Sequence, residues 1–355
     1  MTHFSNIKED NNEFKFKINN NDEIKLSFAN AIRRIMIAQI PIFAIEEESI
    51  IFDENTSMLH DSYLAKRLTL LPINYENIKD YDIKNINISL NIKNNDDYIS
   101  SVYTKDFNVE YNNILVSNFF THDNILFAKL KPEQSINLRC NIIKSNKELN
   151  GTEFCTVCKS IVTYENDTEE LEKVTKDMNA ETKQKFLNIM SETYYYKNKN
   201  NEPTTYIFDV ESVGMINPIK IVGFSLNILK EKIKNIQISL NENNDRKIKV
   251  EESNRNFNSY DFIIIDEDHT LGNLISSYLL DNPEINYSGY IIPHPNDNKL
   301  LITTQLKNNN TEEGNKKIFL ETLDYLSNLT DKLEKEWETS SKKTPTKKIV
   351  IKKSK

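Results

Sequence analysis

Asp266, Glu267, Asp268 and His269 form a dense run of oxygen and imidazole side chains in the stretch DEDHTLGNLISSYLL. Carboxylates suit Mg²⁺ or Mn²⁺, so one interpretation is a metal-dependent phosphodiesterase that uses Asp266, Asp268 and His269. Four consecutive residues cannot easily all face one ion, however, and no second ligand group follows at helical or strand spacing. Acidic residues before a helix also stabilise its positive end, by about 0.3–1 kcal/mol each. We therefore favour a helix that begins near Leu271, and we keep the metal site as the alternative.

The cysteines form a second, weaker candidate metal site. The chain has 3 cysteines. Cys155 and Cys158 make one CxxC pair, and the remaining cysteine is Cys140. A structural zinc ion needs four ligands, and no second CxxC or paired histidine is present. A strand over this segment would also tend to place the two sulfur atoms on opposite faces. We expect no metal and no cofactor in this chain.

Familiar catalytic motifs are absent from the sequence. Neither GxxxxGK[ST] nor GxGxxG occurs, and neither G-x-S-x-G nor HExxH is present. His60 and Asp61 are a local pair without a nucleophile. We therefore expect no catalytic residues and a chain that is catalytically silent by itself.

The composition describes an acidic chain of 355 residues with a formal net charge of -8. That charge argues against a general polyanion binder. The few cysteines indicate a reducing compartment. Nowhere do about 18 apolar residues run together, so the sequence predicts no membrane span. The N-terminus has no apolar signal core. We expect a soluble, intracellular protein.

Apolar spacing predicts the elements that position these residues. Residues 13–18 alternate as a half-buried strand does, and the following KLSFANAIRRIMIAQIP has apolar residues at helical spacing. A longer helix follows Asn217, its predicted N-cap, with Pro218 at the first helical position. After the strand-like FIIID, a second unit repeats this plan and closes with a helix over about residues 316–338. The stripes of the two long helices include Leu226, Leu229, Leu323 and Leu326.

The remaining segments differ in composition. Residues 53–149 contain short alternating runs and predict a mainly β insert domain. The charged stretch 166–190 predicts a helical or loosely ordered insertion. Residues 241–260 combine asparagine and charge without an apolar period and predict a linker. Residues 340–355 predict a basic, disordered tail.

Two short sequences repeat each other at the starts of two predicted helices. SFANAI at 27–32 aligns with TLGNLI at 270–275, a shift of 243 residues. In each, a hydroxyl residue could cap the helix while the asparagine reaches back, as in a capping box. Gly272 costs about 1 kcal/mol inside a helix, which indicates a close approach of a second backbone there. The capping candidates are Ser27, Asn30, Thr270 and Asn273.

Two such units in one chain favour a pseudo-two-fold pairing, which the linker would make intramolecular. Coincidence over six residues is the alternative, although the shared order of elements argues against it.

Four longer segments of the sequence resemble a known protein family. LSFANAIRRIMIAQIP, ENTSMLHDSYLAKRLTLLPI and FDVESVGMINPIKIVGFSLNILKEKI resemble the larger α-like subunit of multisubunit DNA-directed RNA polymerase, called D in archaea. It corresponds to the third subunit of the eukaryotic nuclear enzyme and to bacterial α. EDHTLGNLISSYLLDNPEINYSGYIIPHPNDNKLLITTQL resembles its smaller partner, archaeal L or the eleventh nuclear subunit. The fusion of the two in one Asn/Lys-rich chain is similar to the arrangement in some large DNA viruses.

The resemblance implies an α+β fold in which two α-like dimerisation units, each an antiparallel sheet with two helices, form an intramolecular pseudo-dimer. It implies a discontinuous D-like domain at 1–52 and 150–240 and an L-like domain at 261–339. The insert domain lies at 53–149, the linker at 241–260 and the tail at 340–355. The cysteine-rich element that many D-like subunits carry is absent from residues 80–97. The family's histidine-containing stretch is also altered, because NKELNGTEFCTVC lacks the histidine.

The resemblance also implies roles for single residues. The expected dimerisation residues are Phe28, Ala31, Ile32, Ile35, Leu226, Leu229, Leu271, Gly272, Leu274, Ile275, Tyr278, Leu323 and Leu326. The residues on motifs that face a large subunit are Arg33, Arg34, Lys66 and Arg67. Arginine suits such a contact because its planar fork can pair bidentately with carboxylates. For each of these four, an ordinary solvated position is the alternative.

The leading hypothesis is a noncatalytic scaffold subunit of a DNA-directed RNA polymerase. Its expected partners are the two largest polymerase subunits and other small subunits. It would meet DNA through the complex, with at most weak contact by the tail Lys342–Lys355. The expected location is the cytoplasm, in a viral factory or packaged in the virion, or the nucleus. The competing hypotheses are a free-standing adaptor with an α-like fold and the metal-dependent phosphodiesterase.

Overall fold

The computed structural model describes residues 2–10, 12–145, 151–199, 201–242, 246–294 and 296–342. These residues form two compact units. The pairing unit comprises Met1–Met36, Ser160–Val210 and Val222–Lys355, and the insert unit comprises Ile37–Lys159 and Glu211–Ile221. Both contain antiparallel sheets and helices, so the predicted α+β class is confirmed.

The first repeat of the pairing unit is a four-stranded sheet with two helices. The alternation in EFKFKIN places Phe14, Phe16 and Ile18 on the buried face, where none is more than 1% exposed. The predicted strand is therefore present, and α6 begins at Pro218 as expected, with Asn217 Oδ1 accepting a hydrogen bond from Ile219 N. The strand order is β1 (Phe4–Asp10), β2 (Glu13–Asn19), β13 (Thr205–Ser212) and β12 (Val157–Tyr164), and the helices are α1 (Leu26–Ala38) and α6 (Pro218–Asn241).

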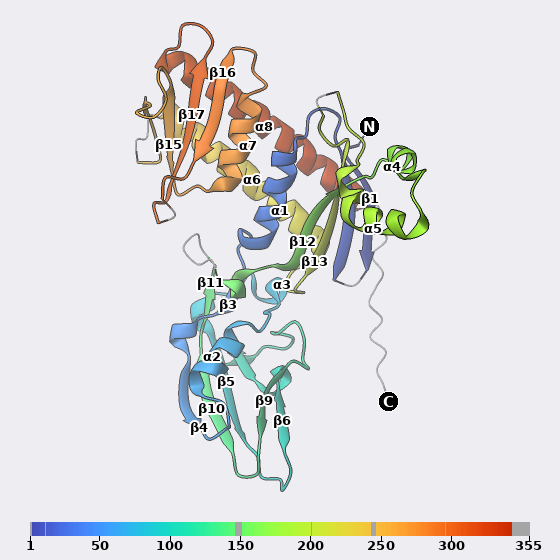
Figure 1. Cartoon of the computed structure of the whole chain (residues 1–355). Helices are drawn as coiled ribbons and strands as arrows, with labels where there is room; N and C mark the ends of the chain where they lie inside the picture. The colour runs from blue at the N-terminus through green and yellow to red at the C-terminus, as the bar shows by residue number, and fades with distance from the viewer. Residues whose placement is uncertain are drawn as a thin grey trace. The chain divides into compact units, whose positions relative to one another are not determined.

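The second repeat has the same plan. Its sheet has the order β14 (Ile248–Glu252), β15 (Tyr260–Ile265), β17 (Lys299–Leu306) and β16 (Ile285–Ile291), and its helices are α7 (His269–Leu279) and α8 (Glu312–Ser341). All neighbouring strands in this sheet are antiparallel. In Figure 1 the four helices α1, α6, α7 and α8 occupy the space between the two sheets.

One part of the predicted linker is instead a strand. β14 (Ile248–Glu252) pairs with β15 over five residues, and Ile248 is 3% exposed. The segment KIKVEE does alternate, but the asparagine and charge around it hide the period. The second repeat therefore begins earlier than residue 261.

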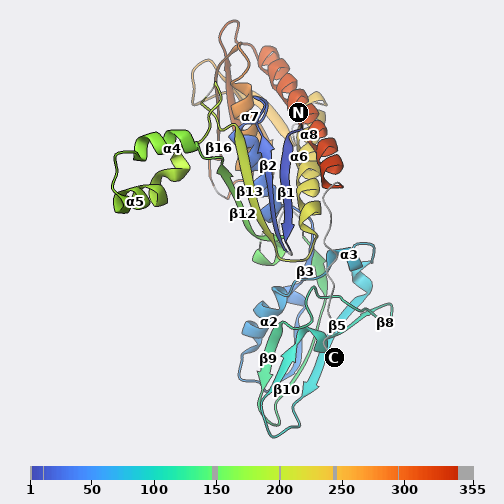
Figure 2. The same ribbon diagram turned by 90° about the vertical axis from the view of Figure 1, so that its right-hand side faces the viewer.

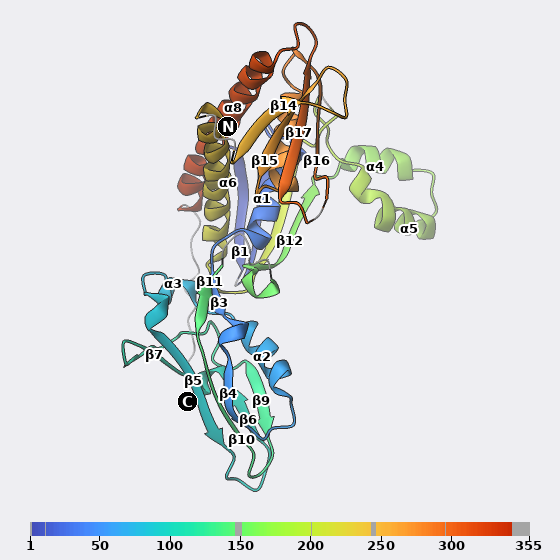
Figure 3. The same cartoon turned by 90° about the vertical axis from the view of Figure 1, so that its left-hand side faces the viewer.

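Helix α8 packs against residues of both sheets. Near its N-terminus the Phe319 ring stacks on Phe262 of the second sheet at 4.1 Å, and near its C-terminus Trp337 packs edge-on against Phe4 of the first sheet at 4.9 Å. Its 30 residues correspond to about 45 Å of helix, which is long enough to reach both cores. Figure 3 shows α8 beside α6 along this length.

The insert unit is mainly β, as predicted. Its five-stranded sheet has the order β4 (Ile51–Asn55), β10 (Ser135–Cys140), β5 (Ile86–Lys93), β7 (Asn108–Tyr111) and β8 (Ile114–Leu115). Two pairs of strands complete it, β3 (Phe43–Ile45) with β11 (Ile142–Lys144) and β6 (Ser100–Tyr103) with β9 (Leu126–Leu130). The helices are α2 (Asp61–Thr69) and α3 (Tyr75–Ile78), and Leu64 and Leu68 of α2 are fully buried.

The boundary of the insert differs from the expected residue 53. β3 pairs with β11 and β4 pairs with β10, so residues 43–52 lie in the insert unit instead of the D-like domain. The partners of these two strands lie about 90 residues later in the chain, which apolar spacing alone cannot show.

The charged stretch 166–190 forms two short helices, α4 (Thr168–Thr175) and α5 (Ala180–Met190). Asp167 and Asn179 cap them through their side chains, and Figure 2 shows the pair standing away from the first sheet. Of the predicted tail, residues 343–355 lie outside the described residues. No helix in the described part of the chain has the length and hydrophobicity that crossing a membrane requires.

Candidate dimerisation interface

Helices α1 and α7 are equivalent elements of the two repeats. With a shift of 243 residues, Leu26, the first residue of α1, aligns with His269, the first residue of α7. Each of the seven buried residues of α1 then aligns with a buried residue of α7. The buried residues of α1 are Ser27, Phe28, Ala29, Ala31, Ile32, Ile35 and Met36, and those of α7 include Thr270, Leu271, Gly272, Leu274, Ile275, Tyr278 and Leu279.

The two helices pair antiparallel through two hydrogen bonds that are related by this shift. Ser27 Oγ lies 2.6 Å from Ser277 Oγ, and Arg34 Nε donates to Thr270 Oγ1 at 2.9 Å. Ser27 is equivalent to Thr270, and Arg34 is equivalent to Ser277. Each bond therefore joins the same two positions with the repeats exchanged, which is the signature of an isologous two-fold contact.

Charged contacts next to these bonds obey the same relation. Lys25 Nζ donates to the Ser277 carbonyl oxygen at 2.8 Å, and Arg34 Nη2 lies 3.3 Å from Asp268 Oδ2. Lys25 is equivalent to Asp268, so these contacts are also a related pair. Lys25 Nζ reaches Asp281 Oδ1 as well, at 2.5 Å.

A tyrosine hydroxyl closes one end of the pair. Tyr278 Oη donates to the Glu23 carbonyl oxygen at 2.9 Å and accepts from Lys25 N at 3.1 Å. Tyr278 is 4% exposed, and burial raises the pKa of its hydroxyl. The phenol therefore remains a neutral hydrogen-bond partner across the interface.

The long helices α6 and α8 extend the interface. Lys230 Nζ lies 2.5 Å from Asp331 Oδ1 and 2.8 Å from Glu334 Oε2, and Gln237 Nε2 donates to Asp324 Oδ1 at 2.6 Å. These contacts run in opposite directions along the two helices, so α6 and α8 are antiparallel.

Further contacts join the repeats away from the α6–α8 seam, and one of them places Lys332 Nζ of α8 2.7 Å from Glu23 Oε2 of the first repeat. Lys232 of α6 pairs with Glu267 of the second repeat at 2.7 Å, and the two side chains are 14% and 8% exposed. His3 Nδ1 of the first repeat lies 3.0 Å from Glu336 Oε2 of α8.

The apolar residues expected at a dimerisation interface are buried in this region. Apart from Gly272, the expected dimerisation residues are at most 4% exposed, the value for Tyr278. The residues of the long helices, Leu226, Leu229, Leu323 and Leu326, are 0% exposed. Their burial removes apolar surface from water, worth about 1.5–3 kcal/mol for each fully buried large side chain. The hydrogen bonds set the alignment of the helices, and these residues fill the space around them.

Comparison with known proteins assigns this architecture. The family model described as the RNA polymerase Rpb3/Rpb11 dimerisation domain matches residues 15–233, and a second model with that description matches residues 259–336. The chain belongs to the Rpb3/Rpb11 dimerisation-domain family. The two matches correspond to the two repeats, so the resemblance to a fused pair of α-like polymerase subunits is confirmed.

Individual relatives agree with the family. The chain is 28% identical over 266 residues to the DNA-directed RNA polymerase II subunit RPB3 of Schizosaccharomyces pombe, covering 66% of this chain and 86% of the relative. It is 42% identical over 67 residues to the probable DNA-directed RNA polymerase II subunit RPB11 of Caenorhabditis elegans, covering 19% of this chain and 55% of the relative. It is 34% identical over 118 residues to the DNA-directed RNA polymerase subunit Rpo3 of Methanocaldococcus jannaschii, covering 33% of this chain and 54% of the relative. The chain thus spans about half of the last two relatives.

Gly272 has a different role from the expected one. A Cβ atom at this position would lie 2.5 Å from Tyr290 Cδ2 and 2.6 Å from Leu300 Cδ1. Both residues belong to the second sheet, so the glycine lets α7 pack closely on the sheet of its own dimerisation domain. The three nearest atoms are all side-chain atoms, not the second backbone that was expected.

The capping prediction is also wrong for the second helix. Asp268 is the N-cap of α7 and accepts a hydrogen bond from Thr270 N, so Thr270 lies inside the helix. Aspartate is among the strongest N-cap residues, and it precedes the threonine by two positions. In the first repeat Ser27 likewise lies inside α1, and Asn30 Oδ1 accepts from Arg33 Nε. The fourth capping candidate, Asn273, is inside α7.

The acidic run at the start of α7 is divided among separate partners. Asp266 lies 3.5 Å from Lys247, Glu267 pairs with Lys232, and Asp268 pairs with Arg34. His269 meets the Tyr290 ring edge-on at 5.8 Å. Within the described residues no group of three or more His, Cys, Asp or Glu side chains is placed to hold a metal ion. The geometry therefore favours the helix lead-in over the metal site.

The CxxC cysteines are not arranged as thiolate ligands. Cys158 lies in β12 and donates to the Glu211 carbonyl oxygen at 3.4 Å, whereas Cys155 precedes the strand. Burial raises the pKa of both thiols, and the carboxylates of Glu153 and Glu211 raise it further. The neutral thiol is thus favoured at both positions.

The four residues expected to face a large subunit have different surroundings in the structure. Arg34 is held by Thr270 and Asp268 within the interface, and Arg67 donates to the carbonyl oxygens of Phe127 and Leu126 within the insert unit. Lys66 is half exposed and lies near two glutamates. Arg33 is half-buried, and its pKa is lowered by burial and by the charge of Arg34.

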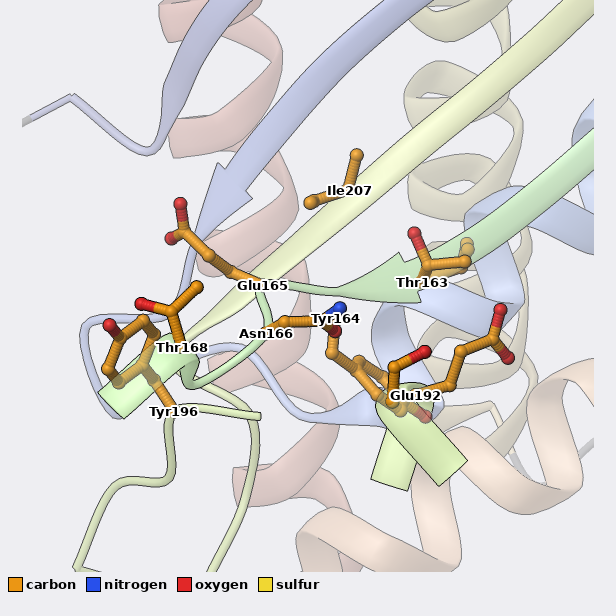
Figure 4. A pocket seen from close by; sticks show the side chains of 10 residues that line it. Thr163, Tyr164, Glu165, Asn166, Thr168, Glu192, Tyr196 and Ile207 are labelled. Atoms are coloured by element: carbon orange, nitrogen blue, oxygen red, sulfur yellow. The ribbon is translucent and has the colours of Figure 1, made fainter. Parts of the chain in front are cut away.

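The pocket in Figure 4 lies at the base of α4 and α5, beside β12 and β13. Its volume is about 640 Å³. Glu165 on its wall already pairs with Lys17 at 2.7 Å. The described residues that line it include no histidine or cysteine and are Val162, Thr163, Tyr164, Glu165, Asn166, Thr168, Ser191, Glu192, Tyr196 and Ile207.

Sequence reasoning missed several interface residues. Lys25, Ser277 and Asp281 make hydrogen bonds or ion pairs across the pair, and Trp337 joins α8 to the first sheet. Extending the 243-residue alignment beyond its six matching positions pairs Lys25 with Asp268 and Ser277 with Arg34, the positions that make the related contacts, whereas the equivalent of Asp281 is Ala38 and gives no such signal.

Proposed function

We propose that this chain is a noncatalytic assembly subunit of a DNA-directed RNA polymerase, in which the two fused dimerisation domains form an α-like pair within one polypeptide. The observation that supports this most directly is the isologous contact between α1 and α7, in which Ser27 meets Ser277 and Arg34 meets Thr270. Both helices lie in segments that match the Rpb3/Rpb11 dimerisation domain.

The pair would act as a platform on which two large catalytic subunits assemble, together with other small subunits. Covalent fusion raises the effective concentration of one repeat for the other to the millimolar range typical of short linkers. The platform would therefore form with the folding of a single chain. We propose that it needs no metal and no cofactor, that it performs no chemistry, and that it works in the compartment where the polymerase is assembled.

Copurification tests the proposal. Tagged wild-type chain, expressed in cells that contain the rest of the enzyme, should bring down two polypeptides of the size of large polymerase subunits. The purified chain alone should show no nucleotidyl transfer. If the folded chain associates with neither large polypeptide, the scaffold role fails and the free-standing adaptor is favoured.

A pair of substitutions connects this result to the interface. Leu274→Asp buries a charge in a fully buried position, costs several kcal/mol, and should abolish copurification. Leu280→Asp, six residues later at the C-cap of α7 and 54% exposed, is the matched control and should leave it intact. Equal copurification of both variants would separate polymerase binding from the pairing of the repeats.

A further inference from the structure

The charged residues at the ends of α1 and α7 differ in sign between the repeats. The first repeat contributes Lys25 and Arg34, and the second contributes Asp268 and Asp281. Lys25 meets Asp281 at 2.5 Å, and Arg34 meets Asp268 at 3.3 Å. Both of these ion pairs thus join a cation of the first repeat to an anion of the second.

The buried residues of α1 and α7 do not distinguish an unlike pair of repeats from a like pair. All seven buried positions of α1 coincide with buried positions of α7 under the 243-residue shift. The apolar stripes are therefore similar enough that a first repeat could pack on another first repeat, or a second on a second. Something other than apolar burial must favour the unlike pair.

The shift also identifies which charges would meet in like pairs. Lys25 is equivalent to Asp268, Arg34 to Ser277, and Ala38 to Asp281. In the observed pair, the position of Lys25 approaches the positions of residues 34 and 38 on the opposing helix.

Two first repeats would therefore place Lys25 of each beside Arg34 of the other. Two second repeats would place Asp268 of each beside Asp281 of the other. Both like pairs contain two contacts between charges of the same sign, whereas the unlike pair contains two contacts between opposite charges.

We propose that Lys25, Arg34, Asp268 and Asp281 are specificity residues that select the pairing of a first repeat with a second repeat and disfavour both like pairs. Discrimination between partners is a difference of free energies, and like-charge contacts increase that difference by destabilising the wrong pair. The inference depends on the pairing of the repeats within the proposed function, and it does not depend on polymerase binding.

A charge exchange at positions 25 and 281 tests the electrostatic contact. Lys25→Glu should lower the thermal unfolding midpoint by about 2–4 °C, and adding Asp281→Lys should restore it. Because Asp281 is 58% exposed, the loss should shrink in high salt. Exchanging Lys317 and Glu321, an exposed pair within α8, is the control. If the double variant is no more stable than Lys25→Glu, the contact is not electrostatic and the proposal is wrong.

The same double variant tests selectivity separately from stability. Lys25→Glu with Asp281→Lys keeps an opposite-charge contact in the unlike pair, but it gives both like pairs opposite charges as well. After unfolding and refolding at high protein concentration, wild-type chain should be monomeric, and the double variant should contain several-fold more dimer by light scattering. A monomer fraction equal to that of the wild type would overturn the selectivity role.

Disulfide mapping distinguishes the dimers. With Ser27→Cys and Ser277→Cys added, a dimer that exchanges unlike repeats between chains can form a disulfide between positions 27 and 277. A dimer of like repeats cannot, because position 27 then faces Arg34. The proposal requires dimers that lack this disulfide, and dimers that contain it would contradict it.

Discussion

Ser27 of α1 and Ser277 of α7 face each other with their Oγ atoms 2.6 Å apart, although they are 250 residues apart in the chain. The contact between Arg34 and Thr270 is its counterpart with the repeats exchanged. Two bonds related in this way specify both the antiparallel direction and the register of the helices. The fold therefore contains an internal two-fold relation that the following substitutions can test.

Tyr278→Phe removes one hydroxyl from the interface and nothing else. Its two partners, the Glu23 carbonyl and the Lys25 N–H, both belong to the first repeat. We expect the free energy of unfolding to fall by about 1–3 kcal/mol, because both backbone groups lose a buried partner. Tyr325→Phe, at a ring that is 47% exposed, should change it by much less. Urea unfolding followed by the fluorescence of the single tryptophan measures both, and equal effects would contradict the assigned role.

Gly272→Ala and Gly223→Ala should have opposite effects although both glycines lie inside helices. At Gly272 the new Cβ would lie 2.5 Å from Tyr290 Cδ2, so overpacking should cost about 1–3 kcal/mol. At Gly223 the nearest atom, Trp337 Cδ1, is 3.6 Å away, so the substitution should gain up to about 1 kcal/mol of helix propensity. Thermal unfolding of the two variants should shift in opposite directions.

Trp337→Ala should destabilise the pairing unit by about 3–5 kcal/mol, because it opens a cavity where α8 meets the first sheet. Trp337 is 3% exposed and lies within 6 Å of the rings of Phe4, Phe14 and Phe16, with centroid distances of 4.9, 5.7 and 5.2 Å. Phe257→Ala, at a side chain that is 96% exposed, is the control. Circular dichroism can follow both transitions. A small loss for Trp337→Ala would show that the end of α8 does not hold the repeats together.

The carboxylate of Asp268 should make stability depend on acid pH. Burial raises its pKa, but hydrogen bonds from Thr270 and the charges of Lys232 and Arg34 lower it by more, so the net pKa lies below its ordinary value of 3.8. The folded state thus binds this proton more weakly than the unfolded state. Its contribution is present above the ordinary pKa and is lost as the pH falls through the folded-state pKa.

Asp268→Asn tests this pH dependence while keeping an N-cap oxygen. The variant should be less stable than the wild type at neutral pH, and the difference should shrink as the pH falls below about 4. Urea titrations between neutral and acid pH measure it. A difference that stays constant over this range would assign the effect of Asp268 to capping alone.

Much of the pairing unit follows from local patterns in the sequence. Phe14, Phe16 and Ile18 alternate as a half-buried strand requires, and Asn217 with Pro218 marks the start of α6. The match of SFANAI with TLGNLI was enough to predict that α1 and α7 are equivalent. These features depend on neighbours in the chain, which is why they can be read from it.

The features that escaped prediction depend on distant partners. The strand β14 was hidden in an asparagine-rich stretch, and the two strands between residues 43 and 55 pair with strands about 90 residues later. The resemblance implies that Arg34 faces a large subunit, and the sequence does not show its contacts with Thr270 and Asp268, which are more than 230 residues away. The sequence predicts a close contact at Gly272, although only the three-dimensional structure shows that its neighbours are Tyr290 and Leu300.

A disulfide between positions 27 and 277 tests the intramolecular pairing most directly. Ser27→Cys with Ser277→Cys replaces two oxygens 2.6 Å apart with sulfurs, and mild oxidation of the dilute, folded chain should join them. The account predicts a product that stays at the mass of one chain, 41.5 kDa, with the 27–277 link found by peptide mapping. Folded chain that forms no such link, or forms it only between two chains, would contradict the pairing of the repeats within one polypeptide.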